Sequence, residues 1–167
     1  MRFTILFALT ALGAMAQNPL TADVKGNYES VRNNLVKAAE KMPEGSYDFK
    51  PSHDVRSFGQ LVGHVADASG AFCAGASGEK SPVAGVEKGK KTKAELVEAL
   101  KAAFGFCDSV YDAMTDAKGA ELTKFFGRER TKLGILAFNN MHDNEHYGNI
   151  VTYMRIRGLV PPSSEGR

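Results

Sequence analysis

Apolar residues recur every three or four positions along four long segments, and this spacing constrains the fold more than any other feature of the chain. Three of the segments alternate steps of three and four, as helices do along the seam of a four-helix bundle. The first has Val24, Tyr28, Val31, Leu35, Ala38 and Met42, the second Phe58, Leu61, Val65, Ala68 and Phe72, and the third Leu96, Leu100, Ala103, Cys107, Val110 and Met114. The pattern predicts an all-α four-helix bundle.

Signals for helix ends frame these segments. Pro43 stops the first helix, Ser57 is a good N-cap for the second, and Thr92-Lys93-Ala94-Glu95 forms a capping box at the start of the third. The fourth helix is expected over residues 130–157, with Gly158 just past its end and two prolines beyond it. Strand patterns are absent apart from short loop segments.

The connection between the second and third helices is long. Residues 77–91 are rich in lysine and glycine and are expected to be exposed, whereas links between bundle helices usually take about two to eight residues. Extended at about 3.3 Å per residue, such a segment can run the full length of a 20-residue helix. The second and third helices could therefore be parallel. A second irregular stretch, residues 115–129, leads into the last helix.

The first sixteen residues have the pattern of a secretory signal peptide. Arg2 precedes an almost unbroken apolar run, and Ala14-Met15-Ala16 offers the small side chains that a signal peptidase requires. The alternative is an apolar N-terminal helix of a cytosolic protein, although such helices are normally amphipathic. We expect residues 1–16 to be a signal peptide, 17–167 to be a single domain, and the protein to be exported, either periplasmic or secreted.

The charges of the chain nearly cancel, with 21 Lys and Arg against 19 Asp and Glu. A nucleic-acid-binding module needs a basic stripe, and a polybasic membrane anchor needs a run of like charges; neither is present. We therefore expect no nucleic-acid partner and no membrane association after signal cleavage. A small-molecule substrate is expected instead. The sequence is compatible with both a monomer and a homodimer.

Two of the four histidines lie four residues apart in the predicted last helix. His142 and His146 share a face with apolar residues that point toward the bundle core. Histidines buried in this way need partners for their ring nitrogens, and a divalent metal is one such partner. Hydrogen bonds to carbonyl or carboxylate oxygens are the alternative.

His64, near the middle of the second helix, is the third candidate ligand, because it lies at the interior edge of its helix. Three histidines from two helices give the open coordination of a catalytic metal site, with positions left for water or substrate. His53 lies in a polar linker and is interpreted as a solvated loop residue.

Residues 142–146 also match the H-x-x-E-H pattern of inverted zinc peptidases. That interpretation fails on length, because those enzymes need a further acidic ligand well downstream and a large surrounding domain. Only Glu165, in a terminal tail, follows as an acid. Glu145 is then a residue that flanks the metal ligands or transfers protons, or it is a solvated position on the helix.

Several segments together resemble the DinB family. They are Arg56-Ser57-Phe58-Gly59-Gln60-Leu61-Val62-Gly63-His64-Val65-Ala66-Asp67-Ala68, the terminal H-x-x-x-H helix, and the stretch from His146-Tyr147-Gly148-Asn149 to Leu159-Val160-Pro161-Pro162. The resemblance covers residues 19 to 163. It implies an up-down-down-up bundle with a crossover between the second and third helices. It also implies a divalent cation, usually zinc, nickel or iron, held by His64, His142 and His146.

Characterised relatives in this family include thiol-S-transferases and an isomerase that use low-molecular-weight thiols. We expect a metal-dependent enzyme, of the transferase or hydrolase type, in which the bound ion lowers the pKa of water or of a thiol. Glu145 and Tyr147 are the candidate catalytic residues for proton transfer. The alternative function is a non-catalytic bundle that holds a metal or a small ligand.

Cys73 and Cys107 are the only cysteines of the chain. If the second and third helices were antiparallel, the two residues would lie more than about 10 Å apart along the bundle axis and could not pair. If the helices are parallel, the residues lie at the same level, 16 and 15 positions past Ser57 and Thr92. A disulfide is then expected in an oxidising compartment. The alternative is two unrelated small core residues.

Overall fold

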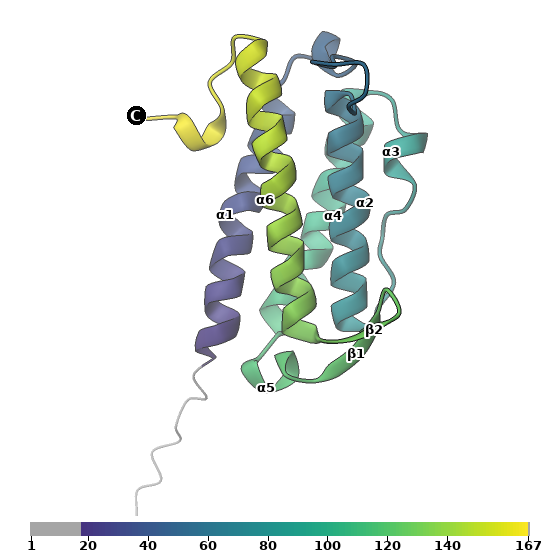
Figure 1. Ribbon diagram of the computed structural model, residues 1–167, viewed down its shortest axis with the longest axis vertical. Coiled ribbons are helices and arrows are strands. Elements are labelled where there is room, and N and C mark those ends of the chain that lie inside the picture. The colour runs from purple at the N-terminus through teal and green to yellow at the C-terminus, as the bar shows by residue number, and fades with distance from the viewer. Residues whose placement is uncertain (1–17, 167) are drawn as a thin grey trace, which may run out of the picture.

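A computed structural model describes residues 18–166, which form four long helices packed side by side (Figure 1). The helices are α1 (Pro19–Lys41), α2 (Phe58–Ser77), α4 (Lys93–Ala113) and α6 (Lys132–Ile156). Their apolar faces meet in one core that contains most of the residues of the predicted seams. The predicted all-α four-helix bundle is confirmed.

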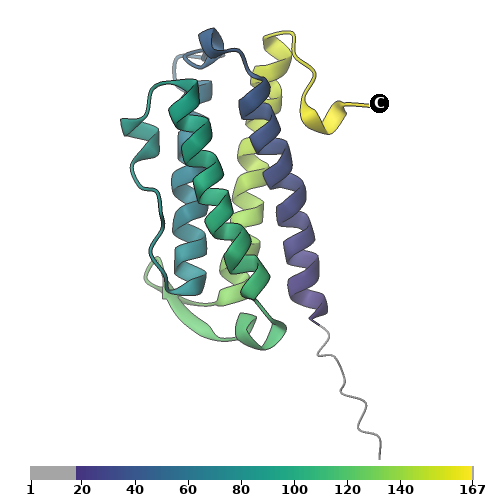
Figure 2. The same ribbon diagram turned by 180° about the vertical axis from the view of Figure 1, so that it is seen from behind.

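The four helices run up, down, down and up in chain order (Figures 1 and 2). Around the bundle, α2 packs against α4 and α6, and α1 packs against the same two helices. The neighbours α2 and α4 are therefore parallel, whereas α2 and α6 are antiparallel. The long crossover from 78 to 92 makes this possible, because it carries the chain back along α2 before α4 begins. It contains one short helical turn, α3 (Val86–Gly89).

The predicted helix starts are present as capping boxes. At the start of α2, the backbone N–H of Gln60 donates to the Ser57 side chain, and the Gln60 side chain accepts from the Ser57 N–H. Thr92 and Glu95 exchange the same pair of bonds at the start of α4. These contacts satisfy backbone donors that a helix terminus otherwise leaves unpaired. A 3₁₀ turn (Glu44–Ser46) lies in the linker between α1 and α2.

The segment before the last helix differs from the expectation. It forms α5 (Asp116–Gly119) and a two-stranded antiparallel hairpin, β1 (Leu122–Phe125) and β2 (Arg128–Thr131). The predicted start of the last helix at residue 130 is therefore two residues early, because Thr131 ends β2 and caps α6 by accepting from the Gly134 N–H. The hairpin turn is Phe126-Gly127, and both residues have positive φ angles, 47° and 74°.

Cys73 of α2 and Cys107 of α4 form a disulfide, with Cα atoms 5.4 Å apart. Both residues are fully buried in the core. The bond joins the two parallel helices that the crossover connects, as the sequence predicts for this topology.

After α6 the chain forms a 3₁₀ turn (Pro162–Ser164) that packs on α1. The predicted signal peptide, residues 1–16, lies outside the described residues. Within residues 18–166, no helix has the length and apolar character needed to cross a membrane.

Candidate metal centre

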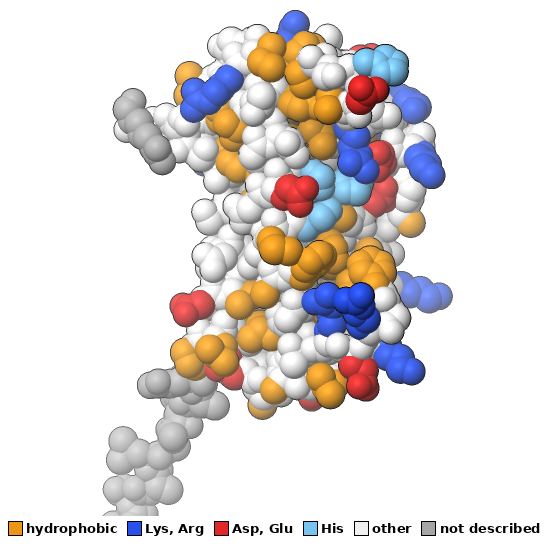
Figure 3. All heavy atoms as spheres, viewed as in Figure 1, with side chains coloured by type: hydrophobic (Ala, Val, Ile, Leu, Met, Phe, Trp, Pro, Cys, Tyr) orange, Lys and Arg blue, Asp and Glu red, His pale blue; other side chains and the backbone are white. Residues whose placement is uncertain are grey.

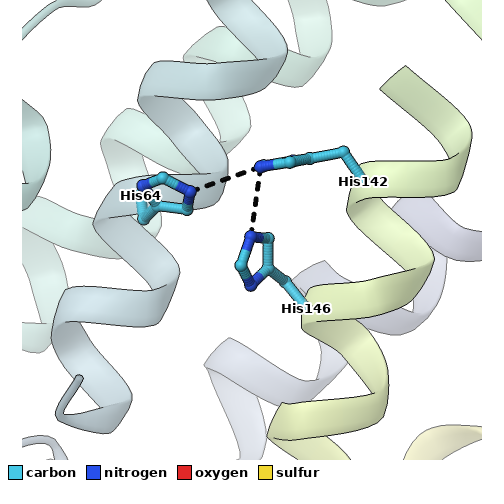
Figure 4. A group of neighbouring side chains, drawn as sticks. All are labelled: His64, His142 and His146. Carbon is cyan, nitrogen blue, oxygen red and sulfur yellow. Dashed lines mark hydrogen bonds between the residues drawn. The ribbon is translucent and has the colours of Figure 1, made fainter. Parts of the chain in front are cut away.

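The rings of His64, His142 and His146 converge between α2 and α6 (Figure 4). The Nε2 atom of His142 lies 3.1 Å from Nε2 of His146 and 3.3 Å from Nε2 of His64. One ring nitrogen from each residue lies within 4.8 Å of the other two. Around a tetrahedral ion with bonds of about 2.0–2.1 Å, neighbouring donors are about 3.3–3.4 Å apart, so the three histidines could hold a metal ion.

The fold explains why these residues meet. His142 and His146 are one turn apart on the face of α6 that packs against α2, and His64 lies in the first half of α2 opposite them. Because the two helices are antiparallel, the first half of α2 lies beside the part of α6 that follows its middle. The cluster is only partly covered: Figure 3 shows histidine side chains at the surface over α2 and α6, with apolar and charged side chains around them.

The three facing Nε2 atoms cannot all be satisfied by one another. A hydrogen bond between two imidazole nitrogens needs one protonated and one bare nitrogen, and each neutral ring carries only one N–H. The Nδ1 atoms of His142 and His146 are buried and have no hydrogen-bond partner in the structure. If they carry the protons, three lone pairs point at one another. A cation between them removes that repulsion, so the donor set fits a divalent metal.

The surroundings favour the uncharged form of two of these histidines, which is the form that binds metal. Burial lowers the pKa of His146 to about 4, and the neighbouring His142 and His64 add to this shift. Burial also lowers the pKa of His64, as does the charge of Arg56, and both outweigh the opposing effect of Glu87. His146 and His64 are therefore in the form that binds a cation at neutral pH.

Two carboxylates lie on the Nδ1 side of the histidine rings, away from the facing Nε2 atoms. Glu87, on α3, accepts a hydrogen bond at 3.0 Å from Nδ1 of His64. Asp143 is completely buried, accepts a hydrogen bond from the Ser69 hydroxyl, and has Oδ1 4.0 Å from Nδ1 of His142. Burial raises the pKa of Asp143, against the lowering effects of the nearby His142 ring and of the hydrogen bond from Ser69.

Sequence reasoning misses both of these acids. It treats the segment that contains Glu87 as an exposed connection, and only the packing of α3 on α2 reveals the contact. Asp143 does carry a signal, because its position in the last helix places it toward the core, where an unpaired carboxylate is costly.

A pocket of about 720 Å³ opens beside the cluster. The residues that matter most for its chemistry are His146, Glu87 and Glu145, and Arg56 and Lys50 supply positive charges. Polar side chains of the linker and of α6 complete its wall: His53, Asp54, Gln60, Asn149, Thr152 and Tyr153. The pocket gives a small polar molecule access to one of the three histidines.

The structure separates the two candidate catalytic residues. Glu145 is exposed and lines the pocket next to His146. Tyr147 is not brought to the cluster, because its position on the helix is about 100° from His146 and about 140° from His142. Its hydroxyl instead donates to the Ser163 hydroxyl at 2.9 Å and accepts from the Ser163 N–H. His53 is a loop residue with a side chain 99% exposed, bonded to Asp54.

A model of the DinB superfamily matches residues 27–150, a range that contains all three histidines. The chain belongs to the DinB superfamily. This DinB protein is also similar to YjoA, an uncharacterized protein of Bacillus subtilis (strain 168). The two are 26% identical over 139 residues, which cover 81% of this chain and 89% of YjoA.

Two solved structures resemble this DinB protein along most of its length. A DinB-like protein from Bacillus cereus ATCC 10987 matches with a TM-score of 0.74 and 17% identity, covering 84% of this chain and 95% of the other. The structure of the DinB-like protein YjoA from Bacillus subtilis matches with a TM-score of 0.70 and 22% identity, covering 87% and 99%. Both likenesses support the DinB-like helical bundle described above.

Proposed function

We propose that this protein is an exported metal-dependent enzyme that acts on a small molecule bound in the pocket beside His146. The observation that carries the proposal is the convergence of three Nε2 atoms, at 3.1 and 3.3 Å, next to a pocket of about 720 Å³. His64, His142 and His146 would hold one divalent cation, of which zinc, nickel and iron are the candidates. Such a cation lowers the pKa of a bound water or thiol and so supplies a nucleophile at neutral pH.

The other residues of the site have distinct roles in this proposal. Glu145 lines the pocket beside a ligand residue, so its carboxylate is placed to accept a proton from a bound nucleophile. Lys50 and Arg56 lie on the same pocket wall and provide donors for polar groups of the substrate. Tyr147 has no part in the proposal, because its hydroxyl is engaged with Ser163.

Export is part of the proposal. It is supported by the signal-like residues 1–16 and by the disulfide between Cys73 and Cys107, since disulfides persist mainly in oxidising compartments. Mass spectrometry of the protein from its native host tests it. A mature chain that begins at Gln17 supports export, and a mature chain that retains residues 1–16 overturns it.

Elemental analysis tests the metal site. The protein purified without chelator should contain one divalent metal per chain, and His146→Ala should lose it. His53→Ala is the matched control, because it removes an exposed histidine from the same pocket and should keep the metal. Full metal content in His146→Ala would contradict the site.

Catalysis is tested separately, with panels of hydrolase and thiol-transfer substrates. Turnover that requires the metal and falls in Glu145→Gln supports the enzyme. A stoichiometric metal with no turnover on any panel would favour the alternative predicted from the sequence, a bundle that binds metal or a small ligand without catalysis.

A further inference from the structure

We propose that Glu87 is a positioning residue for the metal centre. The crossover between α2 and α4, which contains α3, places Glu87 beside His64. This inference rests on the proposed metal site, since it concerns how one ligand of that site is oriented. Glu87 would fix the ring of His64 so that Nδ1 carries the proton and Nε2 faces the other two histidines.

The carboxylate of Glu87 bridges two partners. Its Oε2 atom accepts from Nδ1 of His64 at 3.0 Å, and its Oε1 atom accepts from Nε of Arg56 at 2.9 Å. Because a carboxylate can only accept, the His64 proton must be on Nδ1. The Nε2 atom of a neutral His64 is then bare and points toward Nε2 of His142. This is the tautomer that metal binding through Nε2 requires.

The backbone of α3 is held directly against α2, next to His64. The carboxylate of Asp67 accepts from the backbone N–H groups of Val86 at 2.9 Å and of Glu87 at 3.0 Å. At Gly63 the two backbones touch so closely that an added Cβ would lie 2.7 Å from the Cα of Glu87. Gly63 and Asp67, which neighbour His64 on α2, therefore hold Glu87 in the position from which it orients His64.

Arg56 connects Glu87 to α6 through a further hydrogen bond. The side chain of Arg56 holds Glu87, and the Arg56 carbonyl accepts a hydrogen bond from the Tyr153 hydroxyl at 2.6 Å. Arg56 thus connects the crossover to the helix that carries His142 and His146. A carboxylate fixed from two sides loses little conformational freedom when a metal binds to the histidine that it orients.

Nitrogen-15 NMR of the metal-free protein tests the orientation directly, because the ring shifts report which nitrogen of His64 is protonated. In the wild type, His64 should be protonated on Nδ1. Glu87→Gln should keep this tautomer, because the amide oxygen still accepts the bond, and Glu87→Ala should lose the preference. Glu79→Ala is the matched control, since Glu79 lies exposed in the same crossover.

Zinc affinity, measured by competition with a chromophoric chelator, gives the second readout. Loss of a residue that orients a ligand typically weakens metal binding by about 10- to 100-fold. Glu87→Ala should fall in that range and Glu87→Gln should weaken binding less, while Glu79→Ala should match the wild type. Asp67→Ala removes the two hydrogen bonds that hold α3 and should also weaken binding by loosening α3.

The two readouts separate this inference from the proposed function. A wild type that binds no Zn²⁺ overturns the metal site, and the NMR result on the metal-free protein still decides the role of Glu87. A wild type that binds Zn²⁺ while Glu87→Ala binds it within twofold, with an unchanged His64 tautomer, overturns the role of Glu87. Thermal unfolding of each variant confirms that the fold is intact, and Glu87→Gln, which keeps size and shape, gives the comparison if Glu87→Ala unfolds.

Discussion

Cys73 and Cys107 lie at the same level of two parallel helices, and their disulfide closes a sequence separation of 34 residues. The closed loop contains the whole crossover, including α3 and Glu87. The bond therefore restrains the unfolded chain in the region where the backbone makes its longest excursion outside the bundle.

Removal of the disulfide should lower the free energy of unfolding by about 3–4 kcal/mol, from the chain entropy that the cross-link removes from the unfolded state. Urea unfolding of the metal-free protein, with and without reductant, measures this loss. The double variant Cys73→Ala/Cys107→Ala is the control that does not respond to reductant. A reduced wild type within 1 kcal/mol of the oxidised protein would contradict the prediction.

The metal-free protein should become less stable as the pH falls from about 6.5 to about 4. The pKa of His146 is lowered to about 4 in the folded protein, whereas an unfolded histidine titrates near 6.5. Between these values the unfolded state binds the extra proton, so the stability rises with pH across this window. NMR titration of the His146 ring checks the pKa directly. His146→Gln should flatten this part of the stability profile, and an unchanged profile in that variant would assign the effect elsewhere.

Gly63 and Gly105 make a matched pair for testing the contact between α2 and α3. Both are helical glycines, so alanine should gain about 0.5–1 kcal/mol of helix stability at either position. Apart from its chain neighbours and the backbone of its own helix, no atom of the described residues lies within 4 Å of a Cβ at Gly105, and Gly105→Ala should show this gain. Gly63→Ala instead meets the Glu87 backbone and should destabilise by about 1–3 kcal/mol through overpacking. Thermal unfolding measures both variants, and equal gains would refute the close contact.

Phe126 has a φ of 47° in the two-residue turn of the hairpin, and its side chain is 77% exposed. This left-handed conformation costs about 1–3 kcal/mol for most residues, whereas asparagine tolerates it. Phe126→Asn should therefore stabilise the protein by about 0.5–1 kcal/mol, after the loss of ring contacts with Phe125 and Phe72. Calorimetry of Phe126→Asn and Phe126→Ala checks this, and the alanine variant should not gain. If both variants lose stability equally, the ring contacts outweigh the strain.

The long helices could be predicted from the sequence because their signals are local and redundant. The seams repeat over about four to five turns, and caps such as Ser57 and Thr92 mark the same boundaries independently. The sequence does not predict the hairpin, because its strands have only four residues each, β2 has no apolar residue, and no side chain of either strand is fully buried. Its turn also places a phenylalanine where a turn signal would have asparagine.

The candidate site also has one part that local sequence patterns predict and one part that depends on tertiary packing. His142 and His146 are related by helical spacing alone, so their shared face could be read from the chain. Glu87 reaches His64 across 23 positions, through the packing of α3 on Gly63 and Asp67. Nothing in the local pattern of residues 77–91 distinguishes that acid from the other charges of an exposed loop. Tyr147 follows His146 directly, but neighbouring positions on a helix point to different faces, and its hydroxyl bonds to Ser163.

The pairing of α1 with α6 has a consequence for the order of events during synthesis. A chain that emerges from its N-terminus first presents three helices with an uncovered apolar side until residues 132–156 follow. His142 enters 78 positions after His64, so the cluster of three histidines becomes complete only when this last helix docks. Closure of the core and assembly of the three-histidine cluster are thus a single late step.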